Sequence, residues 1–287
     1  MNVVKTIEAV RTIRWQNSSA TWGLVPTMGY LHEGHISLVR QARAENDFVA
    51  ATIYVNPTQF APTEDLSSYP RDLTRDLALL EEAGADLVFT PNDALMYPHG
   101  FQSYVTVDEV TAVLEGASRP THFRGVTTIV AKLFNIVQPT RAYFGQKDFQ
   151  QTVVVRRMIA DLNINLQMIV CPTVREADGL ALSSRNTYLT PPQREAATVL
   201  SRALKHGLAL LNAGERNGDV LRQEMTAIIT AEPLAQLDYL SVAHPHTLAE
   251  LAQVEDMALL SMAVFVGKTR LIDNMPWPSL TAVYGEA

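Results

Sequence analysis

The chain has 287 residues, of which 47% are hydrophobic and 18% charged, so it can bury the core of one large domain or two modest ones. A formal net charge of -7 argues against a broad nucleic-acid surface, although a local pocket could still bind a small anion. The single cysteine, Cys171, excludes an internal disulfide framework and a cysteine-rich zinc site. No apolar run approaches the roughly 18 residues of a membrane span. We therefore expect a cytoplasmic protein with no membrane or nucleic-acid partner.

Short apolar runs and amphipathic segments alternate from the first strand onward. The runs predict buried strands at residues 22–27, 48–55 and 85–90. Between them, leucines at helical spacing among polar residues predict helices at 35–44 and 71–83. Each strand is thus followed by a helix, the order expected of a parallel sheet.

The same alternation continues through the middle of the chain. Apolar residues from Ile129 to Val137 recur at helical spacing, which predicts a helix buried on one side. A strand at 141–145, a helix at 148–162 and a strand at 166–170 follow. The pattern predicts an α/β fold with a Rossmann-like, doubly wound parallel sheet that binds ligands at the carboxyl ends of its strands.

The character of the sequence changes at about residue 174. A long helix is expected at 190–213, because Thr190, Pro191 and Pro192 suit a cap and first turn, and a second helix at 218–230. Three strands are expected after these helices, in LDYLSVAH, ALLSMAVFVG and TRLIDN. We therefore expect a Rossmann-like domain at 1–173 and a smaller α+β domain at 174–287.

The stretch PTMGYLHEGH (26–35) joins the first strand to the first crossover helix. Gly29 and Gly34 permit a close approach of the backbone to a ligand, and unpaired N–H groups at a helix start favour an anion, most commonly phosphate. His32 and His35 fall in the same first turn and can donate hydrogen bonds to phosphate oxygens. Zinc is disfavoured because zincin histidines are four residues apart and no third ligand is evident. Taken alone, the pair could also be one capping and one solvated histidine.

Six stretches together resemble the pantoate:β-alanine ligase family of the HxGH nucleotidylyl transferase superfamily. The resemblance covers about residues 22 to 190 and extends more loosely to RLIDN. Tyr30 and Thr58 occupy positions that the family leaves variable. HxGH alone is moderately specific, whereas all six stretches in order are strongly so. The stretches are PTMGYLHEGH, VNPTQF, YPR, LEGASRPTHFRGV, FGQKDFQQ and READGLALSSRN.

The resemblance implies an ATP-dependent condensation of (R)-pantoate with β-alanine that gives pantothenate, AMP and pyrophosphate through an enzyme-bound pantoyl adenylate. It also implies Mg²⁺ and a homodimer. The chemistry suits the residue types, because a carboxylate is already ionised at pH 7 and needs alignment and charge neutralisation rather than a general base.

The resemblance also assigns roles in nucleotide binding and catalysis. The two histidines would hold phosphate oxygens, Lys147 would neutralise charge at the α-phosphate, and the LSSR segment would be a mobile phosphate-binding loop. The implied catalytic residues are His32, His35, Lys147, Ser183, Ser184 and Arg185. The implied ATP-binding residues are Met28, Gly29, Tyr30, Leu31, His32, Glu33, Gly34, His35, Gly145, Gln146, Lys147, Asp148, Val174, Leu182, Ser183, Ser184 and Arg185.

The remaining roles concern the other substrates and the metal. By resemblance, the amides of Gln59 and Gln151 would bind pantoate, Met28 and Phe60 would face its gem-dimethyl group, and Gln59 would also bind β-alanine. Asp76 is the carboxylate that the family pattern suggests for Mg²⁺, which commonly relies on substrate phosphates and one or two carboxylates. An aspartate on a helix surface is an equally plausible reading of Asp76.

Simpler readings remain open at the level of single residues and of function. Lys147 beside Asp148 is often a solvated turn pair, Gln59 alone would be a surface residue, and a Ser-Ser-Arg run is usually an ordinary loop. Two other functions would use the same nucleotide signature. One is a nucleotidylyl transferase acting on another small acceptor, and the other is a nucleotide-binding module without catalysis.

Overall fold

The computed structural model describes residues 1–61 and 66–285, which form two compact units. Unit 1 comprises Met1–Gly145 and Val154–Cys171, and unit 2 comprises Gln146–Val153 and the chain from Pro172 onward. The division after Cys171 lies close to the boundary expected at 173/174, which stays a prediction. The short passage of Gln146–Val153 into unit 2 was not expected from the sequence.

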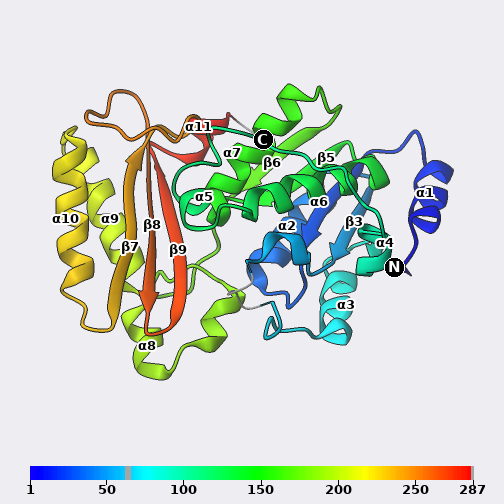
Figure 1. The fold of residues 1–287 in the computed structure, drawn as a ribbon, viewed down its shortest axis with the longest axis horizontal. Helices are drawn as coiled ribbons and strands as arrows, with labels where there is room; N and C mark the ends of the chain where they lie inside the picture. Colours follow the sequence, from blue (N-terminus) through cyan, green and yellow to red (C-terminus); the bar gives the residue numbers. More distant parts are fainter. Residues whose placement is uncertain (62–65, 286–287) are drawn as a thin grey trace. The chain divides into compact units, whose positions relative to one another are not determined.

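Unit 1 contains a parallel sheet with the strand order β1-β4-β3-β2-β5-β6 and helices on both faces (Figure 1). The expected Rossmann-like class is therefore confirmed. The order of the strands reverses between β2 and β5, so a ligand is expected at the carboxyl ends of these two strands. The strands are β1 (Asn2–Val4), β2 (Trp22–Thr27), β3 (Phe48–Ile53), β4 (Leu87–Phe89), β5 (Arg141–Gly145) and β6 (Gln167–Cys171).

The expected strands and helices of this unit are present, with ends that differ by up to two residues, except that α6 begins at His122, seven residues before Ile129. The strand expected at 48–55 ends at Ile53, because the chain turns there toward a 3₁₀ helix that Asn56 caps. The three-residue strand β1 was not predicted, since it is too short for a periodic signal. The helices are α1 (Ile7–Gln16), α2 (Glu33–Glu45), η1 (Pro57–Gln59), α3 (Leu73–Glu82), α4 (Asp93–Met96), α5 (Glu115–Ser118), α6 (His122–Val137) and α7 (Phe149–Asp161), the last of which begins in unit 2.

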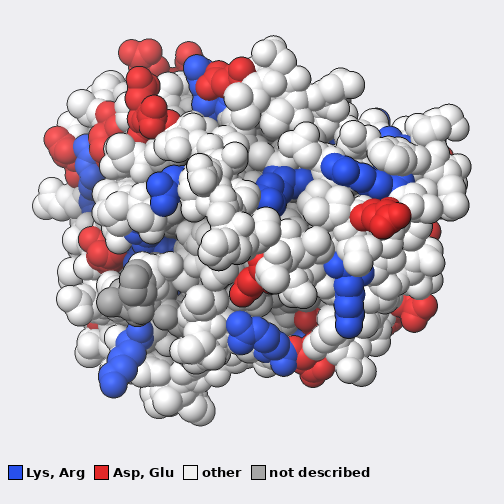
Figure 2. Space-filling model, turned by 45° about the vertical axis from the view of Figure 1, so that its right-hand side comes forward, with Lys and Arg blue, Asp and Glu red and all other residues white. Residues whose placement is uncertain are grey.

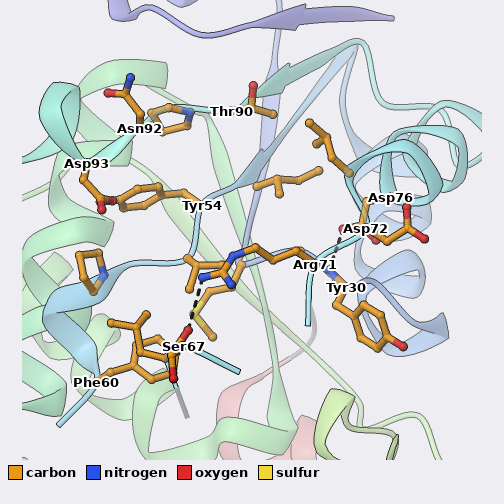
Figure 3. A pocket seen from close by; sticks show the side chains of 18 of the residues that line it. Tyr30, Tyr54, Phe60, Ser67, Arg71, Asp72, Asp76, Thr90, Asn92 and Asp93 are labelled. Carbon is orange, nitrogen blue, oxygen red and sulfur yellow. Dashed lines mark hydrogen bonds between the residues drawn. The ribbon is translucent and has the colours of Figure 1, made fainter. Parts of the chain in front are cut away.

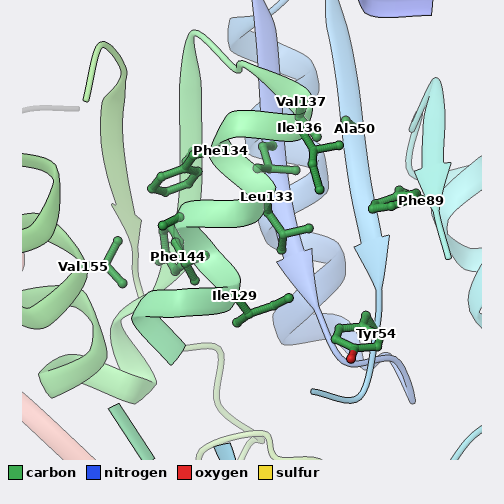
Figure 4. Close-up of a cluster of buried hydrophobic side chains, with 14 of the residues drawn as sticks. Ala50, Tyr54, Phe89, Ile129, Leu133, Phe134, Ile136, Val137, Phe144 and Val155 are labelled. Atoms are coloured by element: carbon green, nitrogen blue, oxygen red, sulfur yellow. The ribbon is translucent and has the colours of Figure 1, made fainter. Parts of the chain in front are cut away.

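Successive strand residues supply the two cores of unit 1, one on each face of the sheet. Trp22 and Leu24 of β2 pack in the cluster that includes α6, and Val25 packs in the cluster that includes α2. Figure 4 shows the first cluster, with Leu133 and Phe134 of α6 among the strand residues. The expectation that α6 is buried on one side is wrong, because most of its residues are buried. A helix that is hydrophobic around most of its circumference needs cover on several sides.

Unit 2 contains an antiparallel sheet of order β7-β8-β9 with helices packed against it, which confirms the smaller α+β part. Its core is formed by apolar residues of α9, α10 and the sheet. The strands are β7 (Ala235–Ala243), β8 (Ala258–Val266) and β9 (Thr269–Trp277). The helices are η2 (Gln146–Asp148), η3 (Ser184–Tyr188), α8 (Pro191–Ala196), α9 (Val199–Asn212), α10 (Gly218–Thr230) and α11 (Leu280–Tyr284).

The single helix expected at 190–213 is wrong, because two helices, α8 and α9, occupy this stretch. The break falls at Ala197 and Thr198. The Thr198 hydroxyl donates to the Glu195 carbonyl at 2.8 Å, and the Leu200 N–H bonds back to the Ala197 carbonyl at 3.4 Å. A threonine side chain that bonds to the nearby backbone competes with the regular helical pattern. Composition alone could not show this break.

Lys and Arg side chains lie among Asp and Glu on the face drawn in Figure 2, with uncharged residues between them. Both signs of charge therefore contribute to the field of this face. Of the helices in the described ranges, none combines the length and hydropathy that a membrane span requires.

Leu133→Ala tests the core on the α6 face of the sheet. Leu133 is 3% exposed, and removing a buried leucine side chain costs about 2–5 kcal/mol of unfolding free energy. We expect a lower urea midpoint by far-UV circular dichroism. The matched control is Leu162→Ala, because Leu162 is 54% exposed and a surface change usually stays within about 0.5 kcal/mol. Equal midpoints for the two variants would contradict the assignment.

Candidate active site

The turn after β2 has a backbone conformation that requires glycine at one position. Gly29 has φ +89°, and a Cβ there would lie 3.0 Å from both Asp76 Oδ2 and Ile53 Cγ2. The Thr27 hydroxyl accepts the Gly29 N–H at 3.2 Å and donates to the Thr52 carbonyl at 2.6 Å. Neighbouring strands thus fix the start of the turn, and the glycine lets the chain reverse close to Asp76.

Asp76 holds the middle of this turn from α3. Its carboxylate accepts the Tyr30 N–H at 2.6 Å and the Leu31 N–H at 2.8 Å. The side chain is only 1% exposed, so the reading of Asp76 as a surface aspartate is wrong. Hydrogen bonds to a charged acceptor are among the stronger ones in proteins, and here they compensate a buried charge. The metal role implied for Asp76 stays a prediction.

His32 and His35 both serve as caps at the start of α2. The Gly34 N–H donates to His32 Nδ1 at 3.2 Å, and the His32 N–H donates to His35 Nδ1 at 3.3 Å. The rings lie side by side, with centroids 4.1 Å apart. Because each Nδ1 accepts an N–H, the neutral imidazoles carry their proton on Nε2. The pair therefore offers two Nε2–H donors, and the reading of one cap and one solvated ring is wrong.

The capping arrangement also corrects the expectation of unpaired N–H groups at the start of α2. Unpaired backbone N–H groups were expected at the start of α2, but the Gly34 N–H is bonded to His32, and the His35 and Ile36 N–H groups bond to the His32 carbonyl. The imidazoles take up backbone donors and present their own. The positive end of the helix still adds its field at this position.

Gln59 and Met28, both expected to contact pantoate, lie next to each other in unit 1. The Gln59 amide donates to the Met28 sulfur at 3.0 Å and accepts from Asn56 Nδ2 at 3.1 Å. The surface-loop reading of Gln59 is therefore wrong, since this side chain is packed and hydrogen-bonded. Phe60 follows directly and is 8% exposed.

Residues of the LEGASRPTHFRGV stretch, for which no role was predicted, hold Gln59 in place. The Gln59 carbonyl accepts from His122 Nδ1 at 2.9 Å and from Arg119 at 3.3 Å. Gly125 packs so closely that a Cβ would lie 2.4 Å from the Thr58 carbonyl oxygen. Gly125 lies before the stretch from Ile129 to Val137 that was predicted as a helix, so periodicity contained no sign of this close approach.

A cavity of about 990 Å³ opens beside these residues at the carboxyl ends of β2, β3 and β4. Met28 and Phe60 line it together with Tyr54, and Arg71 reaches into its middle (Figure 3). Burial, with a hydrogen bond to Asp93, raises the pKa of Tyr54, which therefore stays a neutral hydroxyl. Sequence reasoning missed Tyr54, Asp93 and Arg71, although Arg71 belongs to the quoted YPR stretch.

A further group of residues predicted to bind ATP or pantoate, from Gly145 to Gln151, lies at the end of β5 and directly after it. Gly145 ends this strand, and Gln146, Lys147 and Asp148 form η2 in unit 2. Lys147 Nζ is 3.9 Å from Asp148 Oδ1, and the Lys147 side chain is 20% exposed. The pair of the simpler reading is therefore present, with the aspartate exposed and the lysine partly buried. Gln151 lies in the first turn of α7 and is partly exposed.

In unit 2, the READGLALSSRN stretch folds back on itself. Val174 and Leu182 are joined by a backbone hydrogen bond of 3.0 Å, and Ser183 caps η3, which contains Ser184 and Arg185. The sequence suggested a loop where the structure has this 3₁₀ helix; the predicted mobility stays a prediction.

Arg194 stabilises the turn of this stretch. It binds Glu176 at 2.9 Å and Asp178 at 2.8 Å. The hydrogen bond from Arg194 lowers the pKa of Asp178, and the Leu180 N–H adds to the effect.

A cysteine nucleophile and a metal centre of three or more side-chain ligands both find little support in the described residues. Burial raises the pKa of the Cys171 thiol to about 12, so this side chain is not a thiolate nucleophile near neutral pH. Within residues 1–61 and 66–285, no group of three or more His, Cys, Asp or Glu side chains could hold a metal ion.

The order of the sequence motifs and the capped histidine pair agree with a comparison to known protein families, in which one family matches most of the chain. The family model described as "Pantoate-beta-alanine ligase" matches residues 2–276. The chain belongs to this family. It is accordingly a ligase, as the sequence motifs indicated.

Relatives and solved structures agree with this membership. Pantothenate synthetase of Roseiflexus castenholzii is 62% identical and that of Moorella thermoacetica 56%; each match covers 96% of this chain and 98% of the relative. A crystal structure of pantothenate synthetase from Thermus thermophilus aligns with a TM-score of 0.92 at 48% identity, over 96% of this chain and 99% of that one. The ligase from Francisella tularensis, complexed with beta-gamma ATP and beta-alanine, aligns with a TM-score of 0.78 at 36% identity, over 96% and 97% of the two chains.

Asp76→Asn tests whether the buried carboxylate anchors the turn. An amide keeps one acceptor but turns an NH₂ group toward a backbone N–H, so we expect a loss of about 1.5–3 kcal/mol in urea unfolding. We also expect a slower ligase reaction with an unchanged dependence on Mg²⁺ concentration. Glu82→Gln, at an exposed position of the same helix, is the control. A stable variant that merely requires more Mg²⁺ would show a metal ligand instead.

Proposed function

We propose that the chain condenses (R)-pantoate with β-alanine at the expense of ATP, giving pantothenate, AMP and pyrophosphate. The observation that carries this proposal is the family match over residues 2–276, which includes the histidine pair at the start of α2. The Francisella tularensis ligase, solved with beta-gamma ATP and beta-alanine, supports the choice of substrates.

In the first half-reaction a pantoate carboxylate oxygen attacks the α-phosphorus of ATP. The new P–O bond gives pantoyl adenylate, and the bond to the β-phosphate breaks to release pyrophosphate. The carboxylate is already ionised at neutral pH, so alignment and charge stabilisation are what the protein must supply. The Nε2–H groups of His32 and His35 would donate to phosphate oxygens, and Lys147 would offset the charge that moves onto pyrophosphate.

In the second half-reaction the amine of β-alanine attacks the acyl carbon of pantoyl adenylate, and AMP leaves. The ammonium form must first lose a proton to solvent, because only the free amine has an electron pair to donate. Amide formation should therefore become faster toward alkaline pH. Gln59 is proposed to contact β-alanine as well as pantoate.

Pantoate recognition would combine two amides with an apolar wall. Gln59 and Gln151 can donate to its carboxylate and exchange hydrogen bonds with its hydroxyls, and Met28 and Phe60 would contact its gem-dimethyl group. The contact of Gln59 with Met28, together with the cavity that Met28 and Phe60 line, supports the placement of this acid in unit 1.

The phosphates would be held further by Ser183, Ser184 and Arg185. Mg²⁺ remains part of the proposal, held mainly by the nucleotide phosphates, since both Asp76 oxygens already accept backbone N–H groups. When bound, the ion would supply positive charge at those phosphates. A homodimer and a cytoplasmic location, where ATP is produced, complete the proposal.

Labelled pyrophosphate exchange tests the proposed function. Because adenylate formation is reversible, the protein with ATP, Mg²⁺ and pantoate should move label into ATP without β-alanine. His35→Ala should lower this rate by about 10²-fold or more, since it removes one preorganised donor. His99→Ala, at an exposed position on the turn after α4, should leave the rate unchanged.

Each alternative function predicts a different result in this experiment. A transferase for another acceptor would exchange label only with that acceptor, and a nucleotide-binding module would bind ATP without exchange. Absence of pantoate-dependent exchange in folded protein would refute the proposal. Near-normal exchange by His35→Ala would refute the role of this histidine.

Gln151→Ala tests the proposed pantoate contact. Loss of its amide should weaken pantoate binding by about 1–3 kcal/mol and leave ATP binding nearly unchanged. Isothermal titration calorimetry with each ligand separates the two effects, and Gln223→Ala, at an exposed position on α10, is the control. Equal weakening of both ligands would place the acid elsewhere.

A further inference from the structure

Asp273 and Asn274 of β9 are buried polar residues to which the proposed chemistry assigns no role. Each is 3% exposed, and both belong to the RLIDN stretch that resembles the family only loosely. Buried polar groups of this kind are costly unless every hydrogen bond is satisfied. Their partners therefore show what this part of β9 contributes.

The Asn274 side chain binds the turn that carries Lys147. Its amide nitrogen donates to the Lys147 carbonyl at 2.8 Å and to the Gln146 carbonyl at 3.1 Å. Its oxygen accepts from the Gln146 amide at 3.3 Å. Both protons and the oxygen of the Asn274 amide are thus engaged with two consecutive residues of η2, although Lys147 is 127 positions away in the sequence.

Gln146 extends the same network inside unit 2. It is 7% exposed, and its side-chain oxygen accepts the Thr173 N–H at 3.4 Å. The amides of Gln146 and Asn274 therefore link the backbone at Thr173, Gln146 and Lys147. In a buried network each bond is stronger than in water and cannot easily be replaced by solvent.

Asp273 binds the second segment expected to hold phosphate. It accepts from both terminal nitrogens of Arg175, at 2.6 and 2.8 Å, and Arg175 also donates to the Gly179 carbonyl at 3.0 Å. Arg175 forms a β-bridge with Ala181, two positions before Ser183. The adjacent residues Asp273 and Asn274 of β9 thus hold two places. Asn274 holds the turn that contains Lys147, and Asp273 holds Arg175 at the start of the READGLALSSRN stretch.

We propose that Asn274 is a positioning residue for Lys147 in adenylate formation. This inference rests on the proposed role of Lys147. A lysine has a flexible four-carbon side chain, so the direction of its ammonium depends on how firmly its own backbone is held. The Asn274 amide holds the backbone carbonyls on either side of the Lys147 Cα. A shift of about 1 Å in a catalytic group costs about 10²-fold in rate.

Asn274→Ala and Asn274→Asp test this inference by single-turnover formation of pantoyl adenylate from ATP and pantoate. The aspartate variant keeps the shape and the acceptor but replaces both donors with an oxygen facing two carbonyls. We expect both variants to form the adenylate about 10- to 10²-fold more slowly, with an unchanged amplitude and a pantoate KM within about twofold. The amplitude counts competent molecules, so a merely structural defect would lower the amplitude instead of the rate constant.

Ser261→Ala is the matched control. Ser261 pairs with Asn274 across the sheet, is 6% exposed and has a hydroxyl with no hydrogen-bond partner among the described residues, so its removal should leave the rate constant unchanged. The double variant Lys147→Ala/Asn274→Ala should be no slower than Lys147→Ala alone, because a positioning residue has nothing left to position.

The outcomes separate this inference from the proposed function. A wild-type rate in Asn274→Asp, or independent effects in the double variant, would overturn the positioning role while the wild-type protein still forms adenylate. If Asn274→Ala does not fold, Asn274→Asp decides. A wild-type protein that forms no pantoyl adenylate would overturn the proposed function, and this inference with it.

Discussion

The two hydrogen bonds from the Tyr30 and Leu31 N–H groups to Asp76 hold the backbone from which the histidine pair is built. Gly29 can approach the carboxylate only because it has no Cβ, and the chain then enters α2 with His32 as its cap. A buried carboxylate needs such donors as compensation, and the turn needs an acceptor for its N–H groups. The carboxylate and the two N–H groups thus satisfy each other, so the positions of both imidazoles depend on these two hydrogen bonds.

The same principle recurs at the other segments of the candidate site, where a distant polar side chain holds a backbone carbonyl. His122 binds the Gln59 carbonyl across 63 positions of sequence, and Asn274 binds the Lys147 carbonyl across 127. Such anchors fix the backbone from which the Gln59 and Lys147 side chains extend. The residues proposed to face substrate at these two segments therefore differ from the residues that support them, and the supporting residues are distant in sequence.

The difference between residues in local motifs and supporting residues that are distant in sequence explains how much of the fold and the candidate site could be predicted. Hydrophobic periodicity predicted the alternating strands and helices of unit 1, and the motifs predicted the family, because both signals are local. The break at Thr198 and the cover over α6 depend on single hydrogen bonds and on tertiary packing, which periodicity does not contain. The anchors Asp76, His122 and Asn274 lay within quoted or nearby stretches, but each acts through a partner far away in sequence. The family pattern suggested Asp76 as a metal ligand and its place in a predicted helix suggested a surface residue, and neither signal contains its hydrogen bonds to the turn.

In the histidine pair, by contrast, the same side chain has both a structural role and a proposed chemical role. Each imidazole uses Nδ1 to accept a backbone N–H at the helix start, which directs the proton to Nε2. An asparagine could cap the helix equally well, but it would not present a second donor in the same direction. Conversely, an imidazole released from the cap could expose either nitrogen. The proposed phosphate contact would need a fixed tautomer, and this need would explain why histidines, rather than common capping residues, stand at the start of α2.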